Sequence, residues 1–314
     1  MNAVSLDNVC KSFSDVQAVD ALSIDVPKGS IYGFLGPNGA GKTTTLRMIM
    51  DIIRPDSGRI EVLSHTPVSR VKERIGYMPE ERGLYRKMTV ARVLAYFGSL
   101  KGLSTAELAF RVPQWLARME LNGWANKKVE ELSRGMHQKL QFAVTCINEP
   151  DLLILDEPFS GLDPVNLDLL KGVILDMRSN GTTVIFSTHV MHEAESLCEY
   201  IVLINKGKAI CSGVLDEIRG DRRPRSVSVE IEGDGGFIET LEMVESVNHH
   251  GRRMEVALTG GADPQEFLQT VAGRSVVLAF EVKLPSLHEI FVNLVGADNA
   301  DDANNGKDTQ DSSA

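Results

Sequence analysis

The segment Gly36-Pro-Asn-Gly-Ala-Gly-Lys42-Thr43 constrains the fold of this chain more than any other feature. It matches G-x-x-x-x-G-K-[ST], a loop whose backbone N–H groups converge on phosphate oxygens. An apolar run, Ser30 to Leu35, precedes it, and a helical pattern, Thr44 to Met50, follows. The positive end of that helix favours an anion, and Lys42 is expected to reach the outer phosphates while Thr43 offers its hydroxyl to Mg²⁺. The sequence therefore predicts a strand, a phosphate-binding loop and a helix.

A second motif supplies carboxylates for the same site. Leu152 to Leu155 predict a buried strand, and this strand leads directly into Asp156 and Glu157. Beside a phosphate-binding loop, Asp156 would hold Mg²⁺ through water and Glu157 would lie near an attacking water. Without that loop, the two acidic residues would indicate only the solvent-exposed end of a strand.

The rest of the first part alternates between strands and helices, which favours a parallel α/β sheet. The expected strands are 152–155, 183–186 and 200–204, and the expected helices 165–177 and 191–199. Two further strand candidates, 4–9 and 21–26, have no helix between them and predict a small antiparallel piece at the N-terminus. From Thr89 to Asn148 the pattern is helical, with candidates at 90–100, 106–119 and 136–147.

A cluster of arginines, Arg219 to Arg225, interrupts this pattern and is interpreted as a linker. Beyond it, strands at 227–231 and 276–282 and a helix at 264–271 with Asp263 as its N-cap predict a small α+β domain. A last helix is expected at 286–294. Residues 296–314 contain five Asp and one Lys and are expected to form an acidic disordered tail.

Taken together, these motifs resemble the ATP-binding subunits of ABC transporters. Leu132-Ser-Arg-Gly-Met136 resembles the family signature LSGGQ, Ser160-Gly-Leu-Asp163 resembles the D-loop, and His189 resembles the switch histidine. Phe13 stands where family members stack an aromatic ring on adenine. The resemblance covers roughly residues 1 to 220.

The resemblance implies an ABC ATPase fold: a RecA-like parallel sheet, an N-terminal antiparallel piece and a helical subdomain at about 85–150, all within 1–220. Residues 221–295 would form the accessory α+β domain. Glu157 and His189 are the expected catalytic residues, and Thr43, Glu80 and Asp156 the expected Mg²⁺ ligands. The expected ATP-binding residues are Phe13, Gly36, Pro37, Asn38, Gly39, Ala40, Gly41, Lys42, Thr43, Thr44, Glu80, Ser133, Gly135 and Asp163.

The implied function is ATP hydrolysis by a head-to-tail dimer that encloses two ATP molecules and drives a separate polytopic membrane permease. The dimer would be a homodimer or a heterodimer with a related ATPase subunit. The surroundings of Glu80 and the added C-terminal domain look most similar to type-two ABC export systems, including sodium and drug exporters, so we expect export.

Two positions depart from the family pattern. The Q-loop glutamine is replaced by Glu80, which keeps an acceptor oxygen and loses a donor. The signature keeps Ser133 and Gly135 but has Arg134 and Met136 in place of Gly and Gln. These departures leave open a weakly hydrolysing regulatory subunit. A non-transport ABC ATPase acting on ribosomes or DNA is the other alternative, although its usual second cassette or long coiled coil is absent from this sequence.

Charge and composition agree with these expectations. The formal net charge of −10 excludes a bulk electrostatic grip on nucleic acid or anionic lipid. No apolar run approaches the roughly 18 residues that cross a bilayer, and no secretion signal is evident. The four cysteines show no C-x-x-C pairing, which is typical of a reducing cytosol. We therefore expect a cytoplasmic protein, peripheral on the inner face of the cell membrane through its permease, with no nucleic-acid partner.

Overall fold

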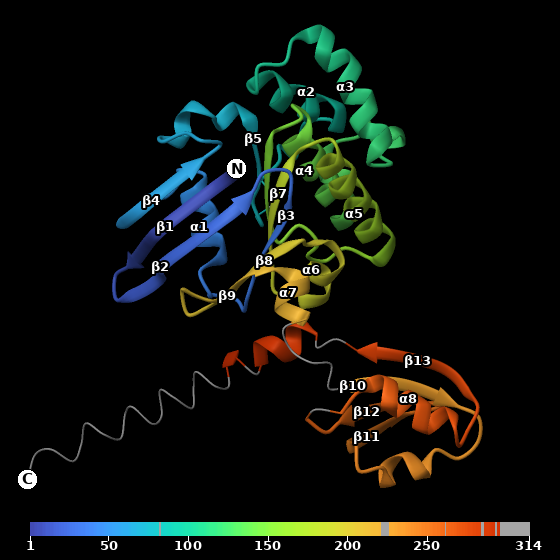
Figure 1. Ribbon diagram of the computed structural model, residues 1–314. Helices are drawn as coiled ribbons and strands as arrows, with labels where there is room; N and C mark the ends of the chain where they lie inside the picture. Colours follow the sequence, from blue (N-terminus) through green and yellow to red (C-terminus); the bar gives the residue numbers. More distant parts are fainter. Residues whose placement is uncertain (82, 221–225, 261, 284–285, 293, 296–314) are drawn as a thin grey trace, which may run out of the picture. The chain divides into compact units, whose positions relative to one another are not determined.

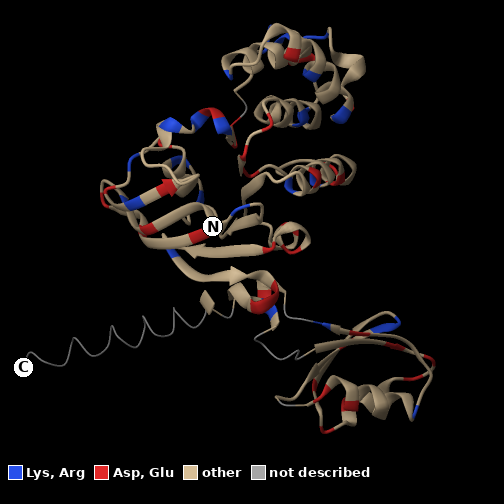
Figure 2. Cartoon of the chain, turned by 45° about the horizontal axis from the view of Figure 1, so that its top comes forward, with Lys and Arg blue, Asp and Glu red and all other residues tan. Residues whose placement is uncertain are grey.

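The computed structural model describes the chain except for residues 82, 221–225, 261, 284–285, 293 and 296–314 (Figure 1). The chain divides into two compact units, Met1–Gly213 and Val214–Ala314. Acidic and basic residues are interspersed in both units (Figure 2). The linker expected at 219–225 lies largely outside the described residues, as does the whole acidic tail.

A six-stranded sheet forms the centre of the first unit, in the order β5-β6-β7-β3-β8-β9. From β5 to β8 the pairing is parallel. All residues of β3, β6 and β7 are buried, because both faces of the sheet are covered, and this explains why their sequences are mainly apolar. The strands are β5 (Ile75–Met78), β6 (Leu152–Asp156), β7 (Thr183–Thr188), β3 (Ile31–Leu35), β8 (Tyr200–Asn205) and β9 (Lys208–Val214).

The predicted N-terminal antiparallel piece is a three-stranded sheet in the order β2-β1-β4. The strands are longer than the expected segments 4–9 and 21–26, because the ladder continues through exposed polar positions such as the Ser12–Gln17 pair. The third strand was not predicted, since only two of its six residues are buried. The strands are β1 (Asn2–Phe13), β2 (Val16–Pro27) and β4 (Ser57–Val62).

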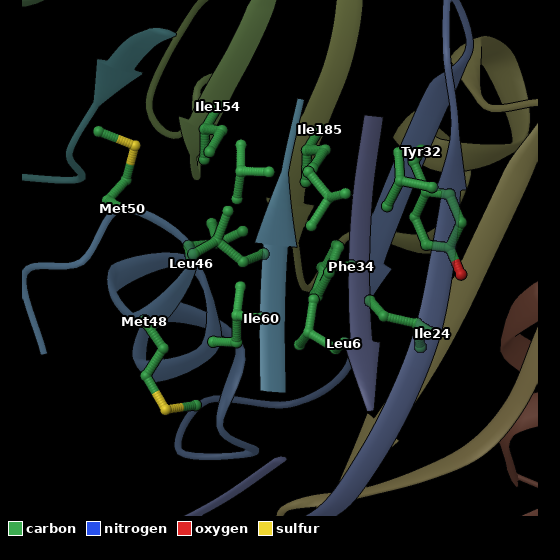
Figure 3. Packing of buried hydrophobic residues seen from close by; sticks show 14 of the residues in the cluster. Leu6, Ile24, Tyr32, Phe34, Leu46, Met48, Met50, Ile60, Ile154 and Ile185 are labelled. Atoms are coloured by element: carbon green, nitrogen blue, oxygen red, sulfur yellow. The ribbon is translucent and has the colours of Figure 1, made fainter. Parts of the chain in front are cut away.

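Helix α1 (Lys42–Ile49) packs between the two sheets and forms the core of this unit (Figure 3). Leu46 belongs to a cluster that contains Leu6 and Ile60 of the antiparallel sheet and Ile154 and Ile185 of the parallel sheet. The helix that follows the phosphate-binding loop is therefore held by apolar contacts on both sides, which fixes the position of its N-terminus.

Helices on the other side of the parallel sheet include α4 (Arg134–Cys146) and α5 (Pro164–Ser179) (Figure 1). The predicted helical segment contains α2 (Val90–Leu100), α3 (Thr105–Arg118) and α4, and none of its described residues belongs to a named strand. Ser104 and Glu107 form a capping box at the start of α3. The remaining short elements of this unit are α6 (Met191–Leu197), η1 (Val68–Arg70), η2 (Lys72–Arg74), η3 (Asn122–Trp124) and η4 (Val129–Glu131).

The second unit contains an antiparallel sheet in the order β11-β12-β10-β13, with α8 (Pro264–Ala272) packed in the same core. Asp263 is the N-cap of α8, as predicted. The hairpin of β11 and β12 was not predicted, because most of β11 is exposed and polar. The other elements are α7 (Leu215–Gly220), β10 (Ser226–Ile231), η5 (Gly236–Thr240), β11 (Val244–His250), β12 (Arg253–Leu258) and β13 (Val277–Lys283).

The expected last helix is described in part, and residues 287–292 are helical. Ser286 and Glu289 bond reciprocally at its start, through side chain and backbone. Among the described helices none is long and apolar enough to cross a bilayer.

Candidate functional site

The phosphate-binding loop connects the end of β3 to α1, as the motif predicts. A Cβ atom at Gly36 would lie 2.1 Å from the backbone oxygen of Ile204, and one at Gly41 would lie 2.3 Å from that of Ala18. Gly41 also has φ +106°, a conformation that L side chains rarely adopt. These two positions therefore require glycine for the loop to pass its neighbours.

Lys42 is buried at the start of α1. Its Nζ donates hydrogen bonds to the carbonyl oxygens of Gly36, at 2.7 Å, and Pro37, at 3.0 Å. Burial lowers the pKa of Lys42, an effect opposed by the charges of Glu157 and Asp156. A phosphate group in the loop would add negative charge beside this desolvated cation, which favours phosphate binding.

Asp156 ends β6 and is fully buried. Its Oδ1 accepts hydrogen bonds from Thr43 Oγ1 at 3.1 Å and from Ser187 Oγ at 2.6 Å. Its Oδ2 is buried and has no hydrogen-bond partner among the described residues. A carboxylate oxygen and a hydroxyl are ligands that suit Mg²⁺. The geometry of Asp156 and Thr43 therefore fits a magnesium ion.

Glu157 follows directly and has φ +50°, which is rare for a residue other than glycine. Its N–H donates to Ser187 Oγ at 3.0 Å. Its carboxylate lies 3.0 Å from Nδ1 of His189 and 3.7 Å from Nζ of Lys42. This carboxylate is therefore held between an imidazole and a cation beside the phosphate-binding loop.

Two other expected site residues, Glu80 and Phe13, are exposed. Glu80 follows β5 and is exposed, and its charge contributes to the electrostatic environment of Lys42. Phe13 ends β1 with 46% of its surface exposed. The ammonium group of Lys11 lies 5.5 Å from the centroid of this ring. Phe13 is thus open to a stacking partner.

Ser133, Gly135 and Asp163 lie at the starts of two helices, and Asn166 lies near both Gly135 and Asp163. Ser133 is the N-cap of α4 and Asp163 the N-cap of α5. Asp163 accepts hydrogen bonds from the backbone and side chain of Asn166, which lower the pKa of the Asp163 carboxyl. A Cβ atom at Gly135 would lie 3.3 Å from Nδ2 of Asn166. The start of α4 therefore packs against the start of α5.

Ser187 is a site residue to which sequence reasoning gave no role. It pairs with Asp156 in the β6–β7 register, and its hydroxyl connects the Asp156 carboxylate to the Glu157 backbone. The available signal was a serine near the end of an apolar strand, where that strand lies beside the strand that ends in Asp156. That signal depends on strand order, which the sequence does not contain.

Two buried glutamines of α4 were also missed. Gln138 Nε2 donates to the carbonyl oxygen of Pro158 at 2.9 Å. Gln141 Nε2 donates to the carbonyl oxygens of Pro79, at 2.8 Å, and Glu81, at 3.1 Å. These amides attach α4 to the segments that follow β6 and β5.

The glycine loop, the buried lysine and the two carboxylates at the end of a parallel strand define a P-loop nucleotide-binding protein. A family model described as "ABC transporter" matches residues 19–160, and one described as "ATP-binding protein DrrA1-3-like, C-terminal domain" matches residues 213–295. The chain belongs to the ATP-binding proteins of the ABC transporter family, which are ATPases.

Similar proteins agree with this assignment. The chain is 39% identical over 294 residues to the ABC transporter ATP-binding protein YhaQ of Bacillus subtilis strain 168, covering 94% of this chain and 99% of the relative. It is 34% identical over 312 residues to the Nod factor export ATP-binding protein I of Sinorhizobium fredii strain NGR234, covering 95% and 88%. A solved ATP-binding subunit of an ABC transporter matches with TM-score 0.65 and 28% identity, covering 70% of this chain and 92% of that one. The predicted fold class is confirmed.

Proposed function

We propose that this chain is the ATP-hydrolysing subunit of an ABC export system and drives a separate membrane permease. The observation that carries the hydrolytic part is the placement of the Glu157 carboxylate between His189 and Lys42, next to Asp156. Export is supported by the match of the second unit to a DrrA-like C-terminal domain and by the name of the Nod factor export relative.

The chain's own residues divide the chemistry between them. Lys42 and the loop 36–44 bind the phosphates, and Phe13 stacks on the base. Glu157 accepts the proton of the attacking water, because its carboxylate is fixed by the backbone bond to Ser187 and by His189. His189 holds the carboxylate and contacts the terminal phosphate. When bound, Mg²⁺ held by Thr43, Asp156 and Glu80 neutralises phosphate charge.

A second ATPase chain completes the site in this proposal. Ser133 is exposed at the N-terminus of α4, where unpaired N–H groups favour an anion. Ser133 and Gly135 of one subunit would cover ATP bound by the other, and Asp163 would connect the two sites. The dimer is a homodimer or a heterodimer with a related subunit.

The permease would dock beside the Glu80 segment. Tyr85 and Tyr96 are both exposed and pack edge to face, with ring centroids 5.4 Å apart. They line a cavity of about 520 Å³ together with Met88, Arg92, Ala95 and Ser99. This aromatic surface suits an apolar helix from a membrane protein. Docking there would place the chain on the cytoplasmic face of the membrane, with no role for nucleic acid.

Glu157→Gln tests the proposal. The substitution keeps the shape of the side chain and removes its basicity, so ATP should still bind while hydrolysis falls by at least about a hundredfold. ATP should then trap a dimer, detectable by size-exclusion chromatography with light scattering. Glu281→Gln, on β13 of the second unit, is the matched control and should keep normal turnover.

Wild-type hydrolysis by the Glu157→Gln variant would overturn the role of Glu157. A wild-type protein that binds ATP but does not hydrolyse it, even in detergent extracts with its permease, would favour a regulatory subunit. Affinity purification from solubilised membranes should recover a polytopic protein, and recovery of ribosomes or DNA would replace the transport proposal.

A further inference from the structure

One face of α4 carries polar side chains that contact the two segments around the candidate site. Arg134, Gln138 and Gln141 are spaced by four and three residues, so they project from the same side of the helix. Gln138 and Gln141 are buried and donate to backbone carbonyl groups that follow β6 and β5. Arg134 stands at the end of this row, next to Ser133.

The guanidinium of Arg134 lies against Gly161. A Cβ atom at Gly161 would be 2.7 Å from Cζ of Arg134 and 2.8 Å from both Nε and Nη2. A Cβ atom at these distances would require the guanidinium to move, so glycine at 161 allows the guanidinium to lie in its present place against the backbone. Gly161 also has φ +72°, which favours glycine independently.

Electrostatic interactions do not explain why an arginine stands at position 134. It lies in the first turn of α4, where the helix dipole disfavours a cation. Within the described part of the chain it forms no hydrogen bond or ion pair with another side chain. Its contact with Gly161 is therefore the interaction that distinguishes it from an ordinary exposed arginine.

Gly161 belongs to the short segment that leads from Glu157 to Asp163. Gln138 contacts this segment near its beginning, at Pro158, and Gly135 approaches Asn166, the partner of Asp163, beyond its end. Arg134 contacts the middle. The N-terminal half of α4 thus contacts the chain after Glu157 near the beginning of this segment, in its middle and just beyond its end.

We propose that Arg134 is a positioning residue that fixes the segment after Glu157 and so couples the signature end of α4 to the Glu157 carboxylate. The inference rests on the proposed function, in which the same end of α4 covers ATP bound by a second subunit. Binding at that distant ATP would then influence the orientation of Glu157 in the subunit's own site. The contact depends on the planar shape of the guanidinium, because a planar group can lie flat against the backbone of a glycine.

A double-mutant cycle tests this coupling in the full-length protein. Arg134→Ala should lower the kcat of ATP hydrolysis about fivefold and change the KM for ATP less than twofold, since the phosphate-binding loop is unaltered. Gly161→Ala should lower kcat by more, because its Cβ both displaces the guanidinium and strains the backbone. In the double variant, Gly161→Ala should cost about fivefold less than it does alone.

Three further measurements separate positioning from a merely structural role. Arg134→Lys keeps the positive charge but replaces the planar guanidinium with an ammonium group, so its kcat should match that of Arg134→Ala. In the Glu157→Gln background, Arg134→Ala should still allow the ATP-trapped dimer to form. Arg70→Gln removes another exposed arginine, in η1, and should leave kcat unchanged.

Additive effects of Arg134→Ala and Gly161→Ala on kcat would overturn the inference, as would full activity of Arg134→Ala. Loss of the trapped dimer on Arg134→Ala would show instead that the residue contacts the partner or its ATP. None of these results affects the hydrolytic part of the proposed function, which fails if the wild-type protein does not hydrolyse ATP or if Glu157→Gln retains turnover.

Discussion

The two units of this chain build their sheets in opposite ways. In the first, β3, β6 and β7 are parallel and completely buried, and polar groups gather where β6 and β7 end. In the second, inward-facing residues of β10 such as Val227 and Val229 are buried, and charged residues lie on neighbouring strands with partly exposed side chains. The difference decides where chemistry can occur.

A parallel sheet covered on both faces leaves its strand ends as places for polar groups, so Asp156, Glu157 and Ser187 converge there. An antiparallel sheet with a charged face distributes its polar groups over a surface, as the Arg253–Glu281 pair illustrates, with 3.8 Å between the charged atoms. The comparison predicts that substitutions at the strand ends and phosphate-binding loop of the first unit change catalysis, whereas substitutions in the core or ion pairs of the second unit change stability.

The largest effect is expected from Lys42→Ala. Removing the buried cation of the phosphate-binding loop should lower the rate of ATP hydrolysis about a thousandfold, because no other side chain can replace it beside Gly36 and Pro37. The thermal unfolding of the second unit should not change. Steady-state ATPase assays combined with calorimetry check both statements. Turnover near the wild-type level would contradict the assignment of catalysis to the strand ends and loop of the first unit.

The next effect should come from Phe267→Ala in the second unit. This ring is fully buried in α8, so its truncation should lower the free energy of unfolding by about 3 kcal/mol. ATP binding to the first unit, measured with a fluorescent analogue, should persist. Leu278→Ala removes a side chain that is 56% exposed and serves as the control with little expected change. Loss of ATP binding in the Phe267 variant would show that the two units do not act separately.

A smaller effect on catalysis is expected from Ser187→Ala. The substitution leaves the Glu157 N–H and the Asp156 Oδ1 each without one hydrogen bond, so kcat should fall about tenfold and the Mg²⁺ concentration for half-maximal activity should rise. Magnesium titrations of the ATPase rate measure both. Ser196→Ala, in α6, is the control. An altered kcat with an unchanged magnesium requirement would contradict the connection to Asp156.

The smallest effect is expected from Glu255→Gln. The neighbouring ammonium group of Lys283 holds the pKa of Glu255 below its usual range, so the ionised carboxylate stabilises the folded state above its unfolded pKa of about 4.3. The variant should lose about 0.5 kcal/mol of unfolding free energy at pH 7, because the pair is partly exposed. This difference should shrink as the pH falls below about 4. Urea titrations at pH 7 and pH 3.5 test the sign, and an equal loss at both values would contradict it.

The sequence predicted the parts of the fold whose signals are local. The glycine loop, the apolar strands 152–155 and 183–186 and the Asp263 cap could each be found from consecutive residues. Strands β4, β5, β9, β11 and β12 could not, because their sequences are short or partly exposed and these strands are recognised only from the strands beside them. The length of β1 and β2 was underestimated for the same reason.

The candidate site shows the same limit. Lys42, Asp156 and Glu157 carry motif signals, whereas the contact of Arg134 with Gly161 depends on how α4 packs. Likewise, Gln141 reaches two backbone carbonyl groups that lie about sixty residues earlier in the chain. Such contacts join elements that are distant in sequence, so no local pattern could have revealed them.

The hydroxyl of Ser187 has an evolutionary consequence. Because one atom serves both the carboxylate of Asp156 and the backbone of Glu157, the proposed function predicts that a change at this position would alter the metal requirement and the activation of water together. Selection could not tune one of these properties through Ser187 while preserving the other. The two would have to diverge through separate substitutions elsewhere, or remain inherited as a single trait.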